Sequence, residues 1–542
     1  MQIIHQRPTP SPRRNKTSRA TRSPPSSSRR IRPLLSNSIV ETLGCSYSLT
    51  RRVWLPSAGL VALLWGAFTL ASTNGIEKNF GGENKDIRIT IEATQASVDV
   101  DAVPQFTDNM LGDFSSPDFS VCPFNYTAYW NHALNLALSS LRKEESLHLA
   151  PRSSSPCPKV FVYDLTPELT DSPSESSIAK VFGRKDEEQK EYKVYSLGGQ
   201  WTSQQYTFPS ILEYRLRNSE RCRTLDPEEA DLFFVPILTA PKAAKSWRRA
   251  CEKIKANTLI PALPYLDSSN ACRHFFALGK GHYNGKACSG WFANPIEELA
   301  PSFRLAYSHF DFDIDERTGE HSRLASDTET KAKYPNLVSV PYPSSVHFWK
   351  NTDVASLPQF SNAHNRTVLM SFVGEVFHGD TQVRRNIIKM CEGYSDYAIC
   401  RGMVSNSLLS KEKSKAVFCL EPAGDSPWRK GLSDSITLGC IPVLFSDLTD
   451  DVAPFHWKSW KDRSRVLIPR KAFVSGCVDL KTLLQSAPPQ LVNLMQRTLR
   501  EKARMFQYSV NDDQEDGIRI ILDGLLREAS QRCPRVEKQS RY

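Results

Sequence analysis

Short apolar runs alternate with helix-like stretches over most of the chain beyond residue 158. The runs at 159–165 (KVFVYDL), 232–238, 416–420 and 441–445 are rich in β-branched and aromatic residues. Between such runs, apolar residues recur with helical spacing, as at 205–216. Short buried strands separated by helices indicate parallel sheets covered by helices. Roughly 350 residues of this pattern exceed what one sheet holds, so the sequence predicts an α/β protein with two Rossmann-like domains.

The positive charge of the chain is confined to its N-terminus. The 542 residues carry a formal charge of +10, and residues 1–52 contain eleven Lys/Arg and a single acid, Glu41. The remaining 490 residues hold 58 basic and 58 acidic side chains. The N-terminal arm is rich in Ser, Pro and Arg, and we expect it to be disordered. A nucleic-acid-binding function based on this arm is one possibility, but the body has no positive excess to support it.

Residues 53–72 (VWLPSAGLVALLWGAFTLAS) contain no charged side chain. Twenty such residues reach across about 30 Å of hydrocarbon. The preceding cationic arm predicts a signal anchor with its N-terminus in the cytosol. A cleaved signal peptide and a buried core helix are the alternatives. A 52-residue positive region is long for a signal peptide, and polar low-complexity flanks argue against a core helix.

Cysteines and glycosylation sequons agree with a lumenal body. Twelve of the thirteen cysteines follow the apolar segment, which suits several disulfides in an oxidising compartment. The pairing cannot be deduced from the sequence, and no CxxC spacing suggests structural zinc. Asn125 and Asn365 begin sequons on the lumenal side, whereas the sequon at Asn15 lies in the cytosolic arm.

The stretch 418–447 reads FCLEPAGDSPWRKGLSDSITLGCIPVLFSD and combines the features of a phosphate-binding unit. An apolar strand leads into a Gly-Asp-Ser-Pro loop, and Ser426 is a suitable N-cap for a helix starting at Pro427. Arg429 would then lie in the first turn, where free backbone N–H groups favour a diphosphate. Gly439 suits the C′ position before the next strand. The alternative interpretation is an ordinary βαβ unit with solvated charges.

These residues, and others in order along 159–510, resemble the exostosin-type glycosyltransferases. The segment 418–447 is similar to the family's FCL-x-P-x-GD-[ST]-P signature with its following Arg, acid, GC-[IV]-PV and Asp. QYTFPSILEYRL, RTLDPEEADLFFVP, RHFFALGKGH, VSVPYP, SFVGE and PFHW follow in family order. The chain departs from the pattern at Leu432-Ser433, where the family has Leu-Phe, and at Gly431, which weakens a helix by about 1 kcal/mol relative to Ala.

The resemblance implies an inverting transferase with the GT-B architecture, anchored in the Golgi as a single-pass type II membrane protein. Its donor, a UDP-sugar, would bind the C-terminal domain, and a glycan acceptor would meet it across the cleft. The expected segments are a basic disordered cytosolic tail (1–52), a transmembrane signal anchor (53–72), a stem (73–155) with a helix near 128–141, an acceptor domain (156–345), a nucleotide-sugar domain (346–515) and a C-terminal tail (516–542).

The candidate donor-binding residues are those that supply backbone approach, cations or a hydroxyl-binding acid. Arg429 and Lys430 would bind the diphosphate, with one of Arg384 and Arg385, and Asp434 would contact the ribose. The remaining candidates are loop residues: Gly374, Gly424, Asp425 and Ser426. No acidic pair stands in a suitable loop, since 311–315 and Asp450-Asp451 suit solvated acids, so we expect no bound cofactor and metal-independent activity.

An inverting transfer needs a general base for the acceptor hydroxyl. Asp164, after the first strand, and His282 are the candidates, and His274 is expected to be a core histidine. The predicted function is transfer of a sugar to a polysaccharide or glycoprotein glycan, either alone or in a homo- or hetero-oligomer with related transferases. The alternative is a non-catalytic glycan-binding or scaffold relative, which would have no reason to keep Gly424, Asp425, Arg429 and Asp434.

Overall fold

A computed structural model of the chain describes the regions that form its sheets and the helices around them. The described residues are 124–148, 156–170, 184–185, 192–193, 200–201, 205–239, 250–280, 296–308, 312–345, 347–348, 366–394, 396–402, 406–509 and 515–534. The predicted cytosolic arm and the apolar segment 53–72 lie outside them, as does His282. Among the helices of the described residues, none has the length and apolar character that crossing a bilayer requires.

The first sheet lies in the N-terminal half and is entirely parallel. Its order is β11-β8-β7-β6-β1-β5. The strands are β1 (Val160–Val162), β5 (Arg223–Thr224), β6 (Leu232–Phe234), β7 (His274–Ala277), β8 (Phe303–Ala306) and β11 (Leu337–Ser339). Their side chains are mostly buried, as the apolar runs predicted.

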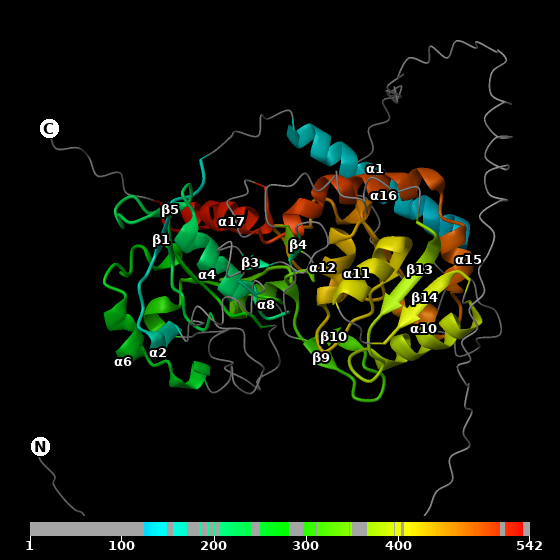
Figure 1. Cartoon of the computed structure of the whole chain (residues 1–542), viewed down its shortest axis with the longest axis horizontal. Helices are drawn as coiled ribbons and strands as arrows, with labels where there is room; N and C mark the ends of the chain where they lie inside the picture. Colours follow the sequence, from blue (N-terminus) through cyan, green and yellow to red (C-terminus); the bar gives the residue numbers. More distant parts are fainter. Residues whose placement is uncertain are drawn as a thin grey trace, which may run out of the picture. The chain divides into compact units, whose positions relative to one another are not determined.

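The second sheet lies in the C-terminal half and is also parallel, with the order β14-β13-β15-β16-β17. The strands are β13 (Val368–Val373), β14 (Ala398–Arg401), β15 (Ala416–Leu420), β16 (Ile441–Leu444) and β17 (Val466–Leu467). Figure 1 shows the yellow strands β13 and β14 among the helices of this half. The prediction of two parallel sheets in an α/β chain is therefore confirmed.

Both sheets share one topology. If the strands of each sheet are numbered in chain order, the first sheet reads 2-1-3-4-5-6 from its β5 edge and the second reads 2-1-3-4-5 from its β14 edge. This is the flavodoxin-like variant of the doubly wound fold, in which the strand order reverses between the first and third strands, the topological switch point. Ligands bind such sheets beyond the carboxyl ends of these two strands. In the second sheet they are β13 and β15, and in the first they are β1 and β6.

The longer helices pack around these sheets. They are α4 (Phe208–Asn218), α10 (Thr381–Gly393), α11 (Asn406–Lys415), α12 (Lys430–Thr437), α16 (Pro489–Lys502) and α17 (Gly517–Arg532). The shorter helices are α2 (Pro167–Thr170), α6 (Ala256–Leu259), α8 (Asp327–Lys333), α13 (Asp447–Asp450), α14 (Arg470–Val474) and α15 (Leu480–Gln485). Two-stranded pairs are formed by β9 (Phe312–Ile314) with β10 (His321–Arg323), β2 (Arg184–Lys185) with β3 (Tyr192–Lys193), and β4 (Gln200–Trp201) with β12 (His347–Phe348).

Helix α1 (Tyr126–His148) falls in the segment predicted as a stem, yet it packs against the C-terminal half. The Trp130 Nε1–H donates to the Leu483 carbonyl at 3.0 Å. Glu144 pairs with Lys502 at 2.6 Å and also with Arg463, and Figure 1 shows α1 beside α16. Burial alone would raise the pKa of Glu144, but its hydrogen bonds and ion pairs with these two cations lower it to about 2. The helix expected near 128–141 is present, while the predicted domain boundaries stay a prediction.

Helix α17 lies in the predicted C-terminal tail and returns to the N-terminal half. A disulfide joins Cys272 to Cys533, the residue that follows the helix. Arg273 also donates to the Cys533 carbonyl at 2.8 Å. Three further disulfides join described residues, namely Cys157–Cys222, Cys391–Cys400 and Cys419–Cys440. The expectation of several disulfides is thus met.

Candidate donor-binding site

A cavity of about 330 Å³ opens at the carboxyl ends of β13 and β15, at the topological switch point of the second sheet. Its wall includes the end of β13 with Gly374 and Glu375, and the first residues after β15, Glu421 and Pro422. Helix α12 forms a further side. The cavity therefore occupies the position at which a doubly wound sheet binds its ligand.

The structure brings most of the predicted donor-binding residues together in this cavity. The predicted residues that line it are Gly374, Arg384, Asp425, Arg429, Lys430 and Asp434. Gly424 and Ser426 belong to the loop that carries Asp425, and Arg385 is exposed on α10. The predictions that these residues bind a donor stay predictions, but their juxtaposition is a property of the fold.

Helix α12 starts later than the sequence suggested. Lys430 is its first residue, and Arg429 occupies the N-cap position in an extended conformation. Ser426 does not cap a helix, because its hydroxyl donates to the Trp428 carbonyl at 2.6 Å. Trp428 is fully buried and lies 5.8 Å from the Trp457 ring, centroid to centroid. The chain bends at 425–428, where the sequence pattern predicted the first turn of the helix, and this bend buries the indole of Trp428.

The first turn of α12 has no side-chain cap, and Lys430 and Gly431 of this turn line the cavity. Its backbone N–H groups therefore supply the partial positive charge of a helix N-terminus at this wall. The other end of the helix is as predicted. Gly439 has a φ of +67°, and Cys440 N–H donates to the Ser435 carbonyl at 2.9 Å, which forms a Schellman motif.

Arg429 lies across the loop that precedes α12. A β carbon on Gly424 would lie 2.3 Å from Arg429 Nε and 2.5 Å from Cζ, so only glycine leaves room for this side chain. The guanidinium is 3.5 Å from the Asp425 carboxylate, and the two side chains are 33% and 57% exposed. A surface pair of this kind contributes about 0–1 kcal/mol, so an anionic ligand could take the place of Asp425.

Arg384 joins the two loops at the switch point. Its guanidinium donates to the carbonyls of Glu375 at 2.7 Å, Ala423 at 3.0 Å and Pro422 at 3.0 Å. Burial, helped by the charge of Arg429, lowers its pKa to about 10. Of the two arginines predicted as alternatives, Arg384 lines the cavity and Arg385 does not.

Asp434 is saturated by protein donors. It accepts from the Ser344 hydroxyl at 3.0 Å, the Ser345 hydroxyl at 3.1 Å and the Ser345 N–H, and it pairs with Lys430 at 3.4 Å. Its side chain is 1% exposed. The carboxylate therefore fastens segment 344–345 to α12, and the predicted ribose contact has little accessible acceptor left.

Lys430 contacts both Asp434 and Ser345. Its Nζ donates to the Ser345 hydroxyl at 2.5 Å, and burial lowers its pKa while the charge of Asp434 opposes this shift. Sequence reasoning missed four other residues of the cavity wall that have polar or charged side chains. They are Ser345, Glu375, His378 and Glu421. The single sequence signal for any of them was Gly431, an unexplained glycine inside α12 that contacts Glu421.

Residues of the N-terminal half lie near Arg429. Burial raises the pKa of Tyr342 to about 12, and the Arg429 charge opposes this rise. Burial also raises the pKa of Tyr206, and the charge of Arg429 opposes this rise. Lys280 Nζ lies 3.2 Å from the centroid of the Tyr206 ring, and burial lowers its pKa to about 8. Sequence reasoning did not select Lys280, whose near-neutral pKa would suit proton transfer.

The predicted bases have different outcomes. Asp164 follows β1, at the switch point of the first sheet, and its side chain is 98% exposed with Arg217 at 3.9 Å. His282 lies outside the described residues. His274 is a core histidine, as predicted. Its Nδ1–H donates to the Asn270 carbonyl, its Nε2 accepts from the Tyr163 hydroxyl at 2.8 Å, and burial lowers its pKa to about 4.

The acidic segments considered for metal binding are engaged in structural contacts. Asp450 pairs with Lys461 at 2.8 Å and with Arg465 at 2.6 Å. Asp315 accepts from the N–H groups of Arg317 and Thr318 at 2.9 Å. Within the part of the chain that the structure describes, no group of three or more His, Cys, Asp or Glu residues is placed to hold a metal ion.

A second cavity, of about 840 Å³, lies elsewhere. Phe303, Leu337 and Phe455 are among its lining residues. The first two begin β8 and β11, so this cavity is at the amino ends of those strands. It is therefore not at either switch point.

Comparison with known proteins identifies the family. The family model of the exostosin GT47 domain matches residues 154–460, more than half of the chain. Xyloglucan galactosyltransferase XLT2 of Arabidopsis thaliana is 25% identical over 353 residues, which cover 60% of this chain and 63% of that protein. Xyloglucan-specific galacturonosyltransferase 1 of the same plant is 24% identical, covering 58% of this chain and 46% of that protein.

The chain thus spans between about half and two thirds of these relatives. Among solved structures, a pneumococcal O-GlcNAc transferase in complex with UDP and GlcNAc matches with 12% identity and a TM-score of 0.28, covering 49% of this chain and 57% of that one. The family model, which covers the cavity-forming strands β13, β15 and β16, decides the assignment. The chain belongs to the exostosin GT47 family.

Proposed function

We propose that this protein is a glycosyltransferase that moves a sugar from a UDP-sugar to a polysaccharide or glycoprotein glycan with inversion at the anomeric carbon. The observation that carries the proposal is the cavity at the carboxyl ends of β13 and β15. It combines Arg384, Arg429 and the uncapped N-terminus of α12. Cations and helix N-termini of this kind bind a diphosphate and stabilise the charge that develops on it as it leaves.

The N-terminal half is proposed to bind the acceptor. Tyr206 and Tyr342 lie near Arg429, and Lys280 Nζ lies 3.2 Å from the centroid of the Tyr206 ring, so we assign these three residues to the part of the acceptor site next to the donor cavity. Asp164 and His282 stay the proposed bases, and Lys280 is a third candidate. The same strand order in both sheets supports a GT-B arrangement, in which donor and acceptor bind to different domains.

The class of acceptor follows from the relatives. Their names specify xyloglucan galactosyl and galacturonosyl transfer, and a further relative, 24% identical, is named a probable β-1,4-xylosyltransferase. A plant-type cell-wall polysaccharide is therefore the first acceptor to test. We also propose a type II orientation in the Golgi membrane, supported by the apolar segment 53–72 after a cationic arm and by disulfides in the body.

The direct test is UDP release by the purified protein from a panel of UDP-sugars, with xyloglucan and xylan oligosaccharides as acceptors. Arg429→Ala should lower the rate by roughly 10- to 150-fold, since a charge-assisted bond to a phosphate contributes about 1.5–3 kcal/mol. Arg142→Ala is the matched control, because Arg142 is exposed on α1. NMR of the product's anomeric proton would test inversion. A folded protein that binds no UDP would indicate the non-catalytic alternative.

A further inference from the structure

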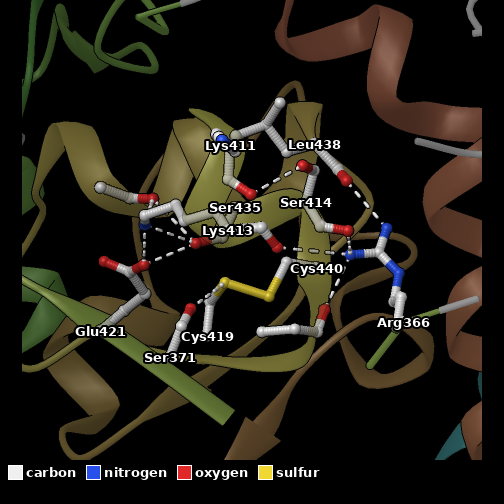
Figure 2. Close-up of a disulfide and its surroundings, with 12 residues drawn as sticks. Arg366, Ser371, Lys411, Lys413, Ser414, Cys419, Glu421, Ser435, Leu438 and Cys440 are labelled. Atoms are coloured by element: carbon white, nitrogen blue, oxygen red, sulfur yellow. Dashed lines mark hydrogen bonds and ion pairs between the residues drawn. A yellow bond between two sulfur atoms is a disulfide. The ribbon is translucent and has the colours of Figure 1, made fainter. Parts of the chain in front are cut away.

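Glu421 is a buried carboxylate in the wall of the proposed donor cavity. It is the first residue after β15, and its Oε1 accepts hydrogen bonds from Lys413 Nζ and from the Ser435 hydroxyl at 2.5 Å. Lys413 also donates to the Gly431 carbonyl at 2.9 Å. Figure 2 shows Lys413 and Ser435 joined to Glu421 beside the Cys419–Cys440 disulfide.

This arrangement holds the carboxylate in one position. The Lys413 and Glu421 side chains are 2% and 9% exposed, so the pair is nearly closed off from water. A buried charge needs such a partner, because an unpaired one would be strongly destabilising. The Cys419–Cys440 disulfide lies two residues before Glu421 and ties β15 to the start of β16. The disulfide thus holds the end of β15, from which Glu421 follows, against the start of β16.

The second carboxylate oxygen, Oε2, has no such partner. Among the described residues no donor is bonded to it, although the side chain lines the cavity. Helix α12 approaches it closely, since a β carbon on Gly431 would lie 2.3 Å from Oε2. Glycine at this position therefore keeps Oε2 open, which accounts for a residue that otherwise weakens the helix.

A fixed, acceptor-only oxygen at this place suits a hydroxyl and not a phosphate, because two anions would repel each other. We propose that Glu421 Oε2 accepts a hydrogen bond from a hydroxyl of the nucleotide-sugar and selects donors that carry it. The hydroxyl belongs either to the ribose or to the transferred sugar, and both present vicinal diols. This inference rests on the proposed function. It also assigns to Glu421 the contact predicted for Asp434, whose oxygens are already occupied.

The test is isothermal titration of the whole protein with UDP, 2′-deoxy-UDP, 3′-deoxy-UDP and UDP-galactose. If the ribose is bound, the wild type should lose about tenfold or more in affinity for one deoxy analogue, and Glu421→Gln should bind UDP and that analogue alike. If the sugar is bound, UDP should bind equally to both proteins, and UDP-galactose should bind about tenfold or more weakly to Glu421→Gln. Either result supports the proposal and identifies the hydroxyl.

The Gln amide would turn its oxygen to Lys413 and place an NH2 donor where Oε2 stood. Gly431→Ala provides a second variant, which keeps the Glu421 and Lys413 side chains but forces Oε2 away from the new methyl group, and it should have the same effect. Glu392→Gln, exposed on α10, and Gly402→Ala, which meets no atom within 4 Å, are the controls. Unchanged affinities in folded Glu421→Gln and Gly431→Ala would overturn the inference alone. A wild type that binds neither UDP nor UDP-galactose would overturn the proposed function, and this inference with it.

Discussion

The position of Arg429 over Gly424 predicts that one added methyl group disables the proposed donor site without unfolding the protein. In Gly424→Ala the new β carbon would lie 2.3–2.5 Å from the Nε, Cδ and Cζ atoms of Arg429. Such a contact is far inside van der Waals distance, so the side chain has to leave the loop surface. Because Arg429 is one third exposed, it can swing into solvent at little cost to folding.

The expected loss of binding follows from the bond to the donor that we propose for Arg429. A charge-assisted hydrogen bond to a diphosphate contributes about 1.5–3 kcal/mol, which corresponds to a roughly 10- to 150-fold rise in the Kd for UDP. The thermal midpoint should stay close to that of the wild type, since the lost surface pair with Asp425 is worth about 0–1 kcal/mol. Replacing Gly by Ala also stabilises by about 0.4–1 kcal/mol where the backbone permits it.

Titration calorimetry with UDP, next to a thermal melt, measures both quantities. Gly402→Ala is the matched control, because its β carbon would meet nothing within 4 Å. In the background of Arg429→Ala, Gly424→Ala should have almost no further effect on UDP affinity, since both changes remove the same bond. Wild-type affinity in Gly424→Ala, combined with a loss in Arg429→Ala, would refute the geometry, because Arg429 would then act from another position.

Three further predictions follow from contacts described above. Activity should survive EDTA, because Asp450 and Asp315 are held by protein partners and Arg384, Arg429 and the N-terminus of α12 surround the proposed diphosphate site; complete loss restored by Mn²⁺ would contradict this. Acid should weaken the attachment of α1: the Glu144 pKa of about 2 in the folded protein is below its ordinary value of 4.5, so its stabilisation is present above about pH 4.5 and is lost as the pH falls towards 2. Tryptophan fluorescence melts should show this pH dependence, and Glu144→Gln should flatten it. Asn125 should carry a glycan and Asn15 none; Asn125 is exposed at the start of α1, and a glycosidase-sensitive mass shift abolished by Asn15→Gln would reverse the topology.

Local patterns in the sequence were enough to predict several of the buried strands. The runs that became β1, β6, β15 and β16 are apolar and β-branched because both faces of a parallel sheet are covered. The start of α12 could not be predicted in this way. Ser426-Pro427 is a good local start signal, but the burial of Trp428 against Trp457, far along the chain, decides the conformation.

The composition of the donor cavity could be predicted only in part. Arg429 and Asp425 stand beside a strand end in a recognisable loop, so the pattern alone points to them. Glu421 was missed because its partners, Lys413 and Ser435, come from α11 and α12, and nothing in the sequence shows that the three side chains converge. The hydrogen bonds of Asp434 could not be predicted for the same reason, since Ser344 and Ser345 reach it from a segment about 90 residues earlier.

The Cys272–Cys533 bond gives this chain a late step in its biosynthesis. The two cysteines are 261 residues apart in the sequence. At about 5–20 residues per second, a ribosome needs roughly 13–50 s to make the intervening segment. During this time the thiol at residue 272 is exposed to oxidation with the wrong partner. Completion of the N-terminal half therefore depends on a residue that is made 261 positions later, and a nonsense codon just before position 533 should leave that half with an unpaired thiol and make the product a substrate for quality control.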